Sequence, residues 1–145
     1  MRRLAIASDH AGHDLKAELV DSLKINLDWC PIDLGLPAGD EQDDYPDAAR
    51  LVAEALLDGR ADRGLLICGS GIGVAIAASK FREIGAALVD DPQAAREGVR
   101  SEGLDVLCLG ARSIETPRAL AVLAAFLEAE PMRLTRRRHG RALDL

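Results

Sequence analysis

The chain has 145 residues, enough for one domain with a substantial apolar core, and its 48% hydrophobic and 29% charged residues exclude a disordered chain. Five of its 18 Lys and Arg residues but only one of its 24 Asp and Glu residues fall in 131–145, so a tail of net charge +4 follows a body of net charge −10. The acidic body, with few aromatic residues, argues against nucleic-acid binding. No apolar run reaches the roughly 18 residues of a membrane helix. The N-terminus has no signal-peptide pattern.

Short apolar strands and amphipathic helices alternate in the order predicted along the chain. Strands are expected at 4–7, 30–34, 64–68, 86–89 and 106–109. A helix is expected after each strand, opening after Gly12, at Pro46, after Gly73, at Pro92 and at Pro117. Apolar strands that are each followed by a helix predict a parallel sheet covered on both faces. We therefore expect the α/β class, a three-layer α/β/α Rossmann-like sandwich with a five-stranded parallel sheet, as a single domain over 1–145 with a basic C-terminal extension from about 131.

Polar residues follow the predicted strands where such folds bind ligands, beyond the carboxyl ends of the strands. Asp9 and His10 follow the first strand, and Tyr45 follows an acidic loop after the second. Arg112 follows the fifth strand. Three cysteines without a CxxC pair are typical of a reducing compartment, so we expect a cytoplasmic protein.

The strongest local signal is the glycine-rich stretch 69–73 between the third strand and the next helix. Its backbone N–H groups would form an anion or oxyanion cradle, although glycines there can also serve the turn alone. No Gly-Lys pair occurs, which excludes a P-loop. The dinucleotide-binding motif G-x-G-x-x-G/A is not matched, because its last position is Val74 when it starts at Gly69 and Ile76 when it starts at Gly71. Asp90, about 20 residues further on, is the one feature that still favours an NAD-dependent oxidoreductase.

Cys68 immediately precedes the glycine-rich stretch, where the start of a helix favours a thiolate. It is therefore a candidate base, whereas Cys30 and Cys108 lie in apolar strand patterns and are expected in the core. Ser70 either donates a hydrogen bond to a developing oxyanion or caps the helix. In the tail, Arg137 and Arg141 are four residues apart and would share one face of a helix, as a phosphate-binding pair could.

These segments, in this order, resemble the ribose-5-phosphate isomerase B family, which includes the galactose-6-phosphate isomerase subunits. The matching stretches are Ser8-Asp9-His10-Ala11-Gly12, Asp44-Tyr45-Pro46-Asp47, 68–73 with 77–80, Leu109-Gly110-Ala111-Arg112 and Arg138-His139. The resemblance implies a Rossmann-like isomerase, free of metal and cofactor, that converts aldoses to ketoses through an enediolate. Its default reaction is ribose 5-phosphate to ribulose 5-phosphate, at sites shared across a homodimer that could pair into a tetramer.

Carried over by position, the resemblance gives Cys68 the proton transfer between C1 and C2. Ser70 stands where the family usually has Thr, beside oxyanion-binding amides of Gly69, Gly71 and Gly73. Asp9 and Tyr45 would contact the sugar. Phosphate would be held by His10, by Arg112 and by tail arginines of the partner subunit, Arg137 and Arg141.

Glu102 occupies the position of the family histidine credited with opening the furanose ring, and the asparagines expected at two positions are Ser79 and Gly103. Ring opening could fall to Glu102, Asp9 or His10. A tetrose 4-phosphate has its O4 blocked and needs no ring opening, so the substrate could instead be a tetrose 4-phosphate, or a hexose 6-phosphate. A noncatalytic module that binds a sugar phosphate or nucleotide is the remaining alternative.

Overall fold

The computed structural model describes residues 1–35 and 44–132. Its strands form one parallel sheet in the order β2-β1-β3-β5-β4. The strands are β1 (Arg2–Ser8), β2 (Trp29–Asp33), β3 (Arg63–Cys68), β4 (Ala86–Leu88) and β5 (Val106–Gly110). The helices are the short 3-10 helix η1 (His10–Gly12), α1 (His13–Leu23), α2 (Tyr45–Leu57), α3 (Ile72–Ala78), α4 (Pro92–Ser101) and α5 (Thr116–Glu128). The predicted fold class is confirmed, with strand ends shifted by one or two residues.

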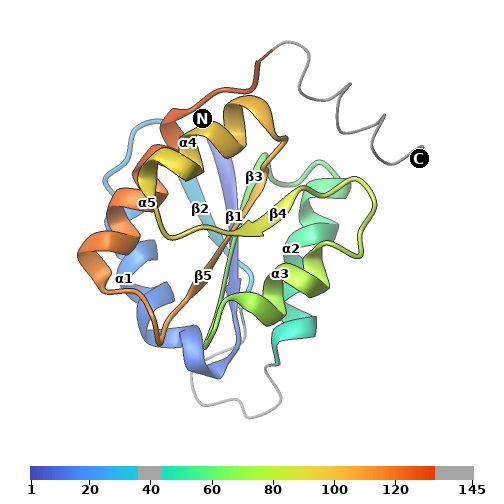
Figure 1. The fold of residues 1–145 in the computed structure, drawn as a ribbon, viewed down its shortest axis with the longest axis vertical. Helices are drawn as coiled ribbons and strands as arrows, with labels where there is room; N and C mark the ends of the chain where they lie inside the picture. The colour runs from blue at the N-terminus through green and yellow to red at the C-terminus, as the bar shows by residue number, and fades with distance from the viewer. Residues whose placement is uncertain (36–43, 133–145) are drawn as a thin grey trace.

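Helices cover both faces of the sheet, with α1, α4 and α5 on one side and α2 and α3 on the other (Figure 1). Successive side chains of β1 alternate between the two cores: Leu4 and Ile6 join the first, and Ala5 and Ala7 join the second. Every residue of β3 is buried. The continuous apolar run that predicted this strand therefore reflects its position at the centre of the sheet.

Cys30 is exposed, so its predicted place in the core is wrong. The reason is that β2 is an edge strand, and its burial is confined to its first residue, Trp29. The indole N–H of Trp29 donates to the carbonyl oxygen of Leu127 at 3.2 Å, which ties the start of β2 to the end of α5. Cys108 is buried, as predicted.

The two ends of the parallel strands define two different edges of the molecule. At the carboxyl edge lie η1, the stretch 69–73, the start of α2 and the turn after β5. At the amino edge lie the ends of α4 and α5, and here the Met132 N–H donates to the Arg100 carbonyl at 3.0 Å. Among the described residues, no helix is both long enough and apolar enough to span a bilayer.

Candidate active site

Asp9 and Cys68 lie side by side at the carboxyl edge. In the register of β1 and β3, Ser8 faces Ile67, and the Asp9 N–H donates to the Ile67 carbonyl at 3.2 Å. Asp9 comes directly after Ser8 and Cys68 directly after Ile67, so the two residues are neighbours on adjacent segments about 5 Å apart. Alternation along β1 directs Asp9 to the same side as Cys68, toward α2 and α3. Both are buried, Asp9 at 7% and Cys68 at 3% exposure.

Gly71 shapes the turn between β3 and α3. Its φ of +78° is a left-handed conformation that an L side chain adopts only with strain. A Cβ there would also lie 2.8 Å from the Gly110 nitrogen and 2.6 Å from a methyl carbon of Leu88. In this turn the Gly71 N–H donates to Cys68 Sγ at 3.1 Å. This hydrogen bond holds the sulfur in the turn just before α3.

Ser70 accepts a hydrogen bond from the Ile72 N–H, the first amide of α3, at 3.1 Å, whereas the N-cap residue of α3 is Gly71, which gives no side-chain cap. The Ser70 side chain is exposed, and a hydroxyl that accepts through oxygen keeps its own hydrogen for donation. This bond therefore leaves Ser70 able to donate to an anion outside the turn. The Gly71 amide, predicted to bind an oxyanion, is instead directed at Cys68.

Two long side chains pack directly on the glycines. The Arg112 guanidinium covers Gly69, where an added Cβ would lie 2.6 Å from Nη1. The Tyr45 ring covers Gly73, where an added Cβ would lie 3.1 Å from Cγ. Backbone bonds hold the turn after β5 against the same stretch, since the Arg112 N–H donates to the Gly69 carbonyl at 3.0 Å. The structure thus gathers Arg112 and Tyr45 at the predicted glycine-rich stretch.

Cys108 lies on β5 opposite Leu66, two residues before the level of Cys68 and on the same face of the sheet. Burial raises the pKa of the Cys108 thiol to about 12, and the charge of Cys68 adds to this effect. Cys108 therefore remains a neutral thiol at physiological pH. Of these two buried cysteines, only Cys68 has a backbone N–H donor at its sulfur and a place at the carboxyl edge.

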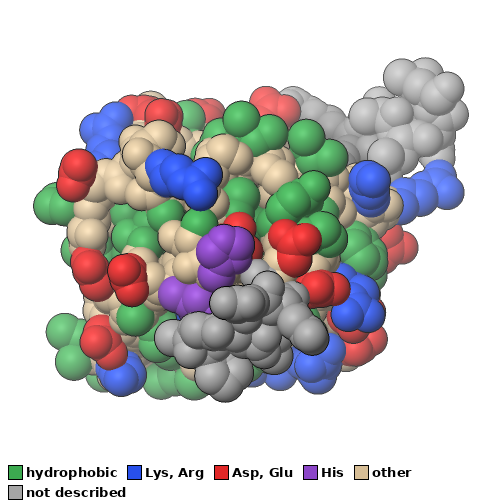
Figure 2. All heavy atoms as spheres, turned by 90° about the horizontal axis from the view of Figure 1, so that it is seen from below, with side chains coloured by type: hydrophobic (Ala, Val, Ile, Leu, Met, Phe, Trp, Pro, Cys, Tyr) green, Lys and Arg blue, Asp and Glu red, His purple; other side chains and the backbone are tan. Residues whose placement is uncertain are grey.

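His10 and Asp9 differ in their freedom to meet a ligand. His10 is exposed in η1, and Figure 2, which views the carboxyl edge, shows histidine side chains near its middle. One Asp9 oxygen accepts the Gly12 N–H at 3.1 Å, so this carboxylate is fixed by η1. Gly12 allows this close turn, because a Cβ there would lie 2.8 Å from the Ile67 carbonyl oxygen.

Glu102 does not join this group within one subunit. It follows α4 at the amino edge, where it lines a hollow of about 400 Å³ together with Ser79 and Arg82. The amino edge is about 13 Å from the carboxyl edge along the strands. This length follows from β3, in which Gly64 pairs with the first residue of β5 and lies four residues before Cys68. Arg137 and Arg141 lie outside the described residues.

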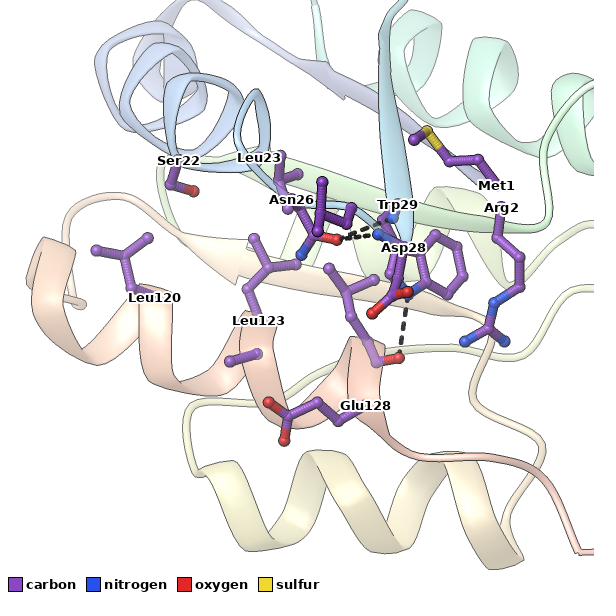
Figure 3. A pocket seen from close by; sticks show the side chains of 13 residues that line it. Met1, Arg2, Ser22, Leu23, Asn26, Asp28, Trp29, Leu120, Leu123 and Glu128 are labelled. Carbon is purple, nitrogen blue, oxygen red and sulfur yellow. Dashed lines mark hydrogen bonds between the residues drawn. The ribbon is translucent and has the colours of Figure 1, made fainter.

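A second hollow, of about 690 Å³, also lies at the amino edge and contains none of the predicted site residues. Its wall includes Trp29, Leu123 and Leu127, between the end of α1 and α5 (Figure 3). Within residues 1–35 and 44–132, no three His, Cys, Asp or Glu side chains converge as metal ligands would.

An apolar surface that was not predicted from the sequence lies beside the glycine-rich stretch. Ile72 and Ile76 on α3 are 54% and 59% exposed, and Leu88 on the edge strand β4 is 41% exposed. The signal for it was the spacing of Ile72 and Ile76, which are four residues apart and share one face of a helix. A contiguous exposed apolar surface indicates a place where another molecule binds.

The sequence and the fold were compared with those of known proteins. A family profile described as Ribose/Galactose Isomerase matches residues 4–144. Ribose-5-phosphate isomerase B of Escherichia coli is 36% identical over 130 residues, covering 90% of this chain and 86% of that protein. D-erythrulose-4-phosphate isomerase of Pectobacterium atrosepticum is 37% identical over 130 residues, covering 90% and 85%. The structure of ribose-5-phosphate isomerase B from Mycoplasma genitalium with bound ribulose-5-phosphate superposes with a TM-score of 0.84 at 36% identity, covering 98% and 91%.

Proposed function

The chain belongs to the ribose/galactose isomerase family of sugar-phosphate isomerases, and from this premise we propose that it interconverts ribose 5-phosphate and ribulose 5-phosphate without a cofactor. The observation that carries the proposal is Cys68, buried beside Asp9 with the Gly71 N–H directed at its sulfur. A single base that can hold negative charge suits a reaction that moves protons between adjacent carbons. No electrons leave the substrate, so the chemistry needs no redox partner.

In the proposed mechanism, the Cys68 thiolate removes the proton from C2 of the open-chain aldose. The C2–H electrons form the C1–C2 double bond, and negative charge develops on O1, giving a cis-enediolate. Ser70 donates a hydrogen bond to this charge, as does the Gly69 or Gly73 amide. The Cys68 thiol then returns the proton to C1, while the proton on O2 passes to O1, so that O1 becomes a hydroxyl and O2 becomes the ketose carbonyl. Cys68 ends as it began, as a thiolate.

Charge at the carboxyl edge supports a phosphorylated substrate. The body of the chain is acidic, so a dianionic phosphate needs local cations to bind. Arg112 on the glycine-rich stretch is exposed and supplies part of that charge, and the exposed His10 in η1 can donate a hydrogen bond to the phosphate. We propose that Arg137 and Arg141 supply the rest from the partner subunit of a homodimer. A cytoplasmic location stays a prediction.

Two observations support a shared site. Glu102 and Met132 both lie at the amino edge, near the Arg100 carbonyl, and Met132 is the last described residue before the arginine tail. In the proposed homodimer, the amino edge of one subunit faces the carboxyl edge of the other, so that Glu102 and the tail of one subunit reach the site of its partner. The apolar surface of Ile72, Ile76 and Leu88 lies beside the glycine-rich stretch and is where we propose the partner binds.

Glu102 favours a second candidate substrate, a tetrose 4-phosphate. The family histidine credited with ring opening is absent at this position, and a related protein is named D-erythrulose-4-phosphate isomerase. A carboxylate can open a furanose ring as a general base, but a tetrose 4-phosphate needs no opening. Comparing kcat/KM for ribose 5-phosphate and erythrose 4-phosphate separates the two candidates, and a strong ribose preference refutes the tetrose.

The reaction itself is tested by incubating the protein with ribose 5-phosphate or erythrose 4-phosphate in D2O. Deuterium should enter C1 of the ketose product, and Cys68→Ala should abolish this exchange. Cys108→Ala is the matched control, since it removes a neighbouring buried thiol that we assign no proton transfer. Binding without exchange for every pentose, tetrose and hexose phosphate would refute the isomerase and favour the noncatalytic module.

The shared site is tested through the oligomeric state. Ile76→Asp places a charge in the proposed interface and should give a monomer by analytical ultracentrifugation, with loss of isomerase activity. Ile25→Asp is the control, because Ile25 is 87% exposed beyond the end of α1, away from this surface. A dimer that survives Ile76→Asp with full activity would show that the partner binds elsewhere.

A further inference from the structure

The end of α5 is held by side chains from the starts of two strands. Arg63 of β3 donates through Nη1 to the Phe126 carbonyl at 2.6 Å and through Nη2 to the Ala129 carbonyl at 2.8 Å. Trp29 of β2 donates to the Leu127 carbonyl, as Figure 3 shows. Carbonyls that end a helix have no partner within it, so these bonds satisfy three groups that would otherwise need water or a glycine cap.

Charges and rings complete this arrangement. Arg2 lies 4.3 Å from the centre of the Trp29 ring and Arg63 lies 5.1 Å from it. Glu130 pairs with both cations, at 2.6 Å from Arg2 and 3.5 Å from Arg63. We call these four residues, Arg2, Trp29, Arg63 and Glu130, the α5 clasp.

The clasp directs the chain after α5. At Ala129 the backbone becomes extended, with φ −74° and ψ 149°. It then crosses to α4, where the Met132 N–H meets the Arg100 carbonyl. The arginine tail begins at the next residue. The clasp therefore fixes the last described residues of the chain, from Ala129 to Met132, which immediately precede the tail in sequence.

Closing the helix alone does not require a buried guanidinium. Arg63 is 5% exposed, and burial lowers its pKa while the Glu130 carboxylate opposes this shift. Burying a charge costs free energy, whereas a glycine cap would satisfy helix carbonyls without that cost. What the clasp adds is a fixed orientation, because the planar guanidinium binds two carbonyls at once.

We propose that Arg63 is a positioning residue for phosphate binding, acting through the arginine tail. The proposal rests on the proposed function, in which the tail arginines bind the substrate phosphate in a partner subunit. An anchored tail presents its arginines at a higher effective concentration than one that leaves a frayed helix. Loss of the clasp should therefore raise KM for the sugar phosphate and leave kcat nearly unchanged.

The test is a double-mutant cycle in the full-length protein. Arg63→Met keeps the apolar stem against Trp29 and removes the hydrogen bonds to the carbonyls. The second member changes all five tail arginines to glutamine (Arg133, Arg136, Arg137, Arg138 and Arg141). Arg63→Met alone should raise KM for ribose 5-phosphate about three- to tenfold. In the glutamine-tail background, where no tail arginine remains to be positioned, it should change KM less than about twofold.

A merely structural role predicts a different pattern, namely the same effect of Arg63→Met on KM in both backgrounds, or a fall in kcat. Either result overturns the proposal. If the glutamine tail raises KM while Arg63→Met does not, the proposed function survives and the positioning role fails. If the glutamine tail leaves KM unchanged, the tail does not bind phosphate, and the positioning role fails with it.

A second pair of variants covers the case in which Arg63→Met does not fold. Glu130→Gln removes the carboxylate that pairs with Arg2 and Arg63, at a side chain that is 59% exposed. Glu128→Gln is the matched control at the end of the same helix. Glu130→Gln should raise KM with kcat unchanged and Glu128→Gln should not; equal KM values for the two refute the role of the clasp.

Discussion

Replacing Gly69 with Ala tests the proposed phosphate site through a single methyl group. A Cβ at Gly69 would lie 2.6 Å from Nη1 and 2.7 Å from Cζ of Arg112. Since ordinary contacts between such atoms begin near 3.5 Å, the guanidinium must move by about 1 Å. The atoms nearest to that Cβ belong to a flexible side chain, and the φ of Gly69 is not in the left-handed region. The fold should therefore accept the change.

The expected cost falls on binding. Loss of one hydrogen bond from a charged donor is worth about 1.5–3 kcal/mol, which corresponds to a rise in KM of roughly ten- to hundredfold. The free energy of unfolding, measured in urea, should change by less than about 1 kcal/mol. The assay is conversion of ribose 5-phosphate to ribulose 5-phosphate, with kcat and KM determined separately.

Arg112→Ala supplies the control background. If Gly69→Ala acts by displacing the guanidinium, the double variant should bind no worse than Arg112→Ala alone. An unchanged KM for Gly69→Ala would refute the role of Arg112 in phosphate binding. Additive effects in the double variant would show that the methyl group acts on something other than Arg112.

Two further predictions concern stability. Gly71→Ala should lower the free energy of unfolding in urea by about 1–3 kcal/mol more than Gly59→Ala does. The two glycines have nearly the same φ, +78° at Gly71 and +76° at Gly59, but of the two only Gly71 would bring a Cβ within 3 Å of backbone atoms. Equal losses of stability would refute the crowding argument. Burial raises the pKa of the Cys108 thiol from 9.0 to about 12. The stabilising effect of the buried neutral thiol is therefore complete below pH 9.0 and is lost as the pH rises toward 12. In that window the free energy of unfolding of the wild type should fall by roughly 1.4 kcal/mol per pH unit relative to that of Cys108→Ala. A constant difference between the two proteins across that range would contradict the assigned pKa.

The apolar runs predicted the strands because a parallel sheet buries both faces, and this held best for β3, at the centre of the sheet. It held least for β2. Cys30 and Trp29 are adjacent in one apolar run, yet only Trp29 is buried, because strand order decides which strand lies at an edge. Strand order depends on long-range pairing, which the run itself does not contain. The exposure of Cys30 therefore could not be predicted from the apolar run alone.

The candidate site divides in the same way. Cys68 ends a strand, and Asp9 and Arg112 each follow one, so topology alone predicts that they meet at one edge. Glu102 precedes a strand, which places it at the opposite edge, but a resemblance carries residue identities without this geometry. Arg63 gave no signal at all, since nothing in the sequence near it indicates that carbonyls from the end of α5 would surround a buried guanidinium.

The location of Cys68 at the end of the central strand has a consequence for heat inactivation. β3 is paired on both sides, by β1 and β5, and its residues are buried, so its amides should exchange with solvent only when the whole domain opens. Local fraying of β2 or β4 at the borders of the sheet leaves Cys68 and Asp9 in register. On warming, the geometry around the sulfur should therefore persist up to the cooperative melting of the fold, rather than decay gradually below it.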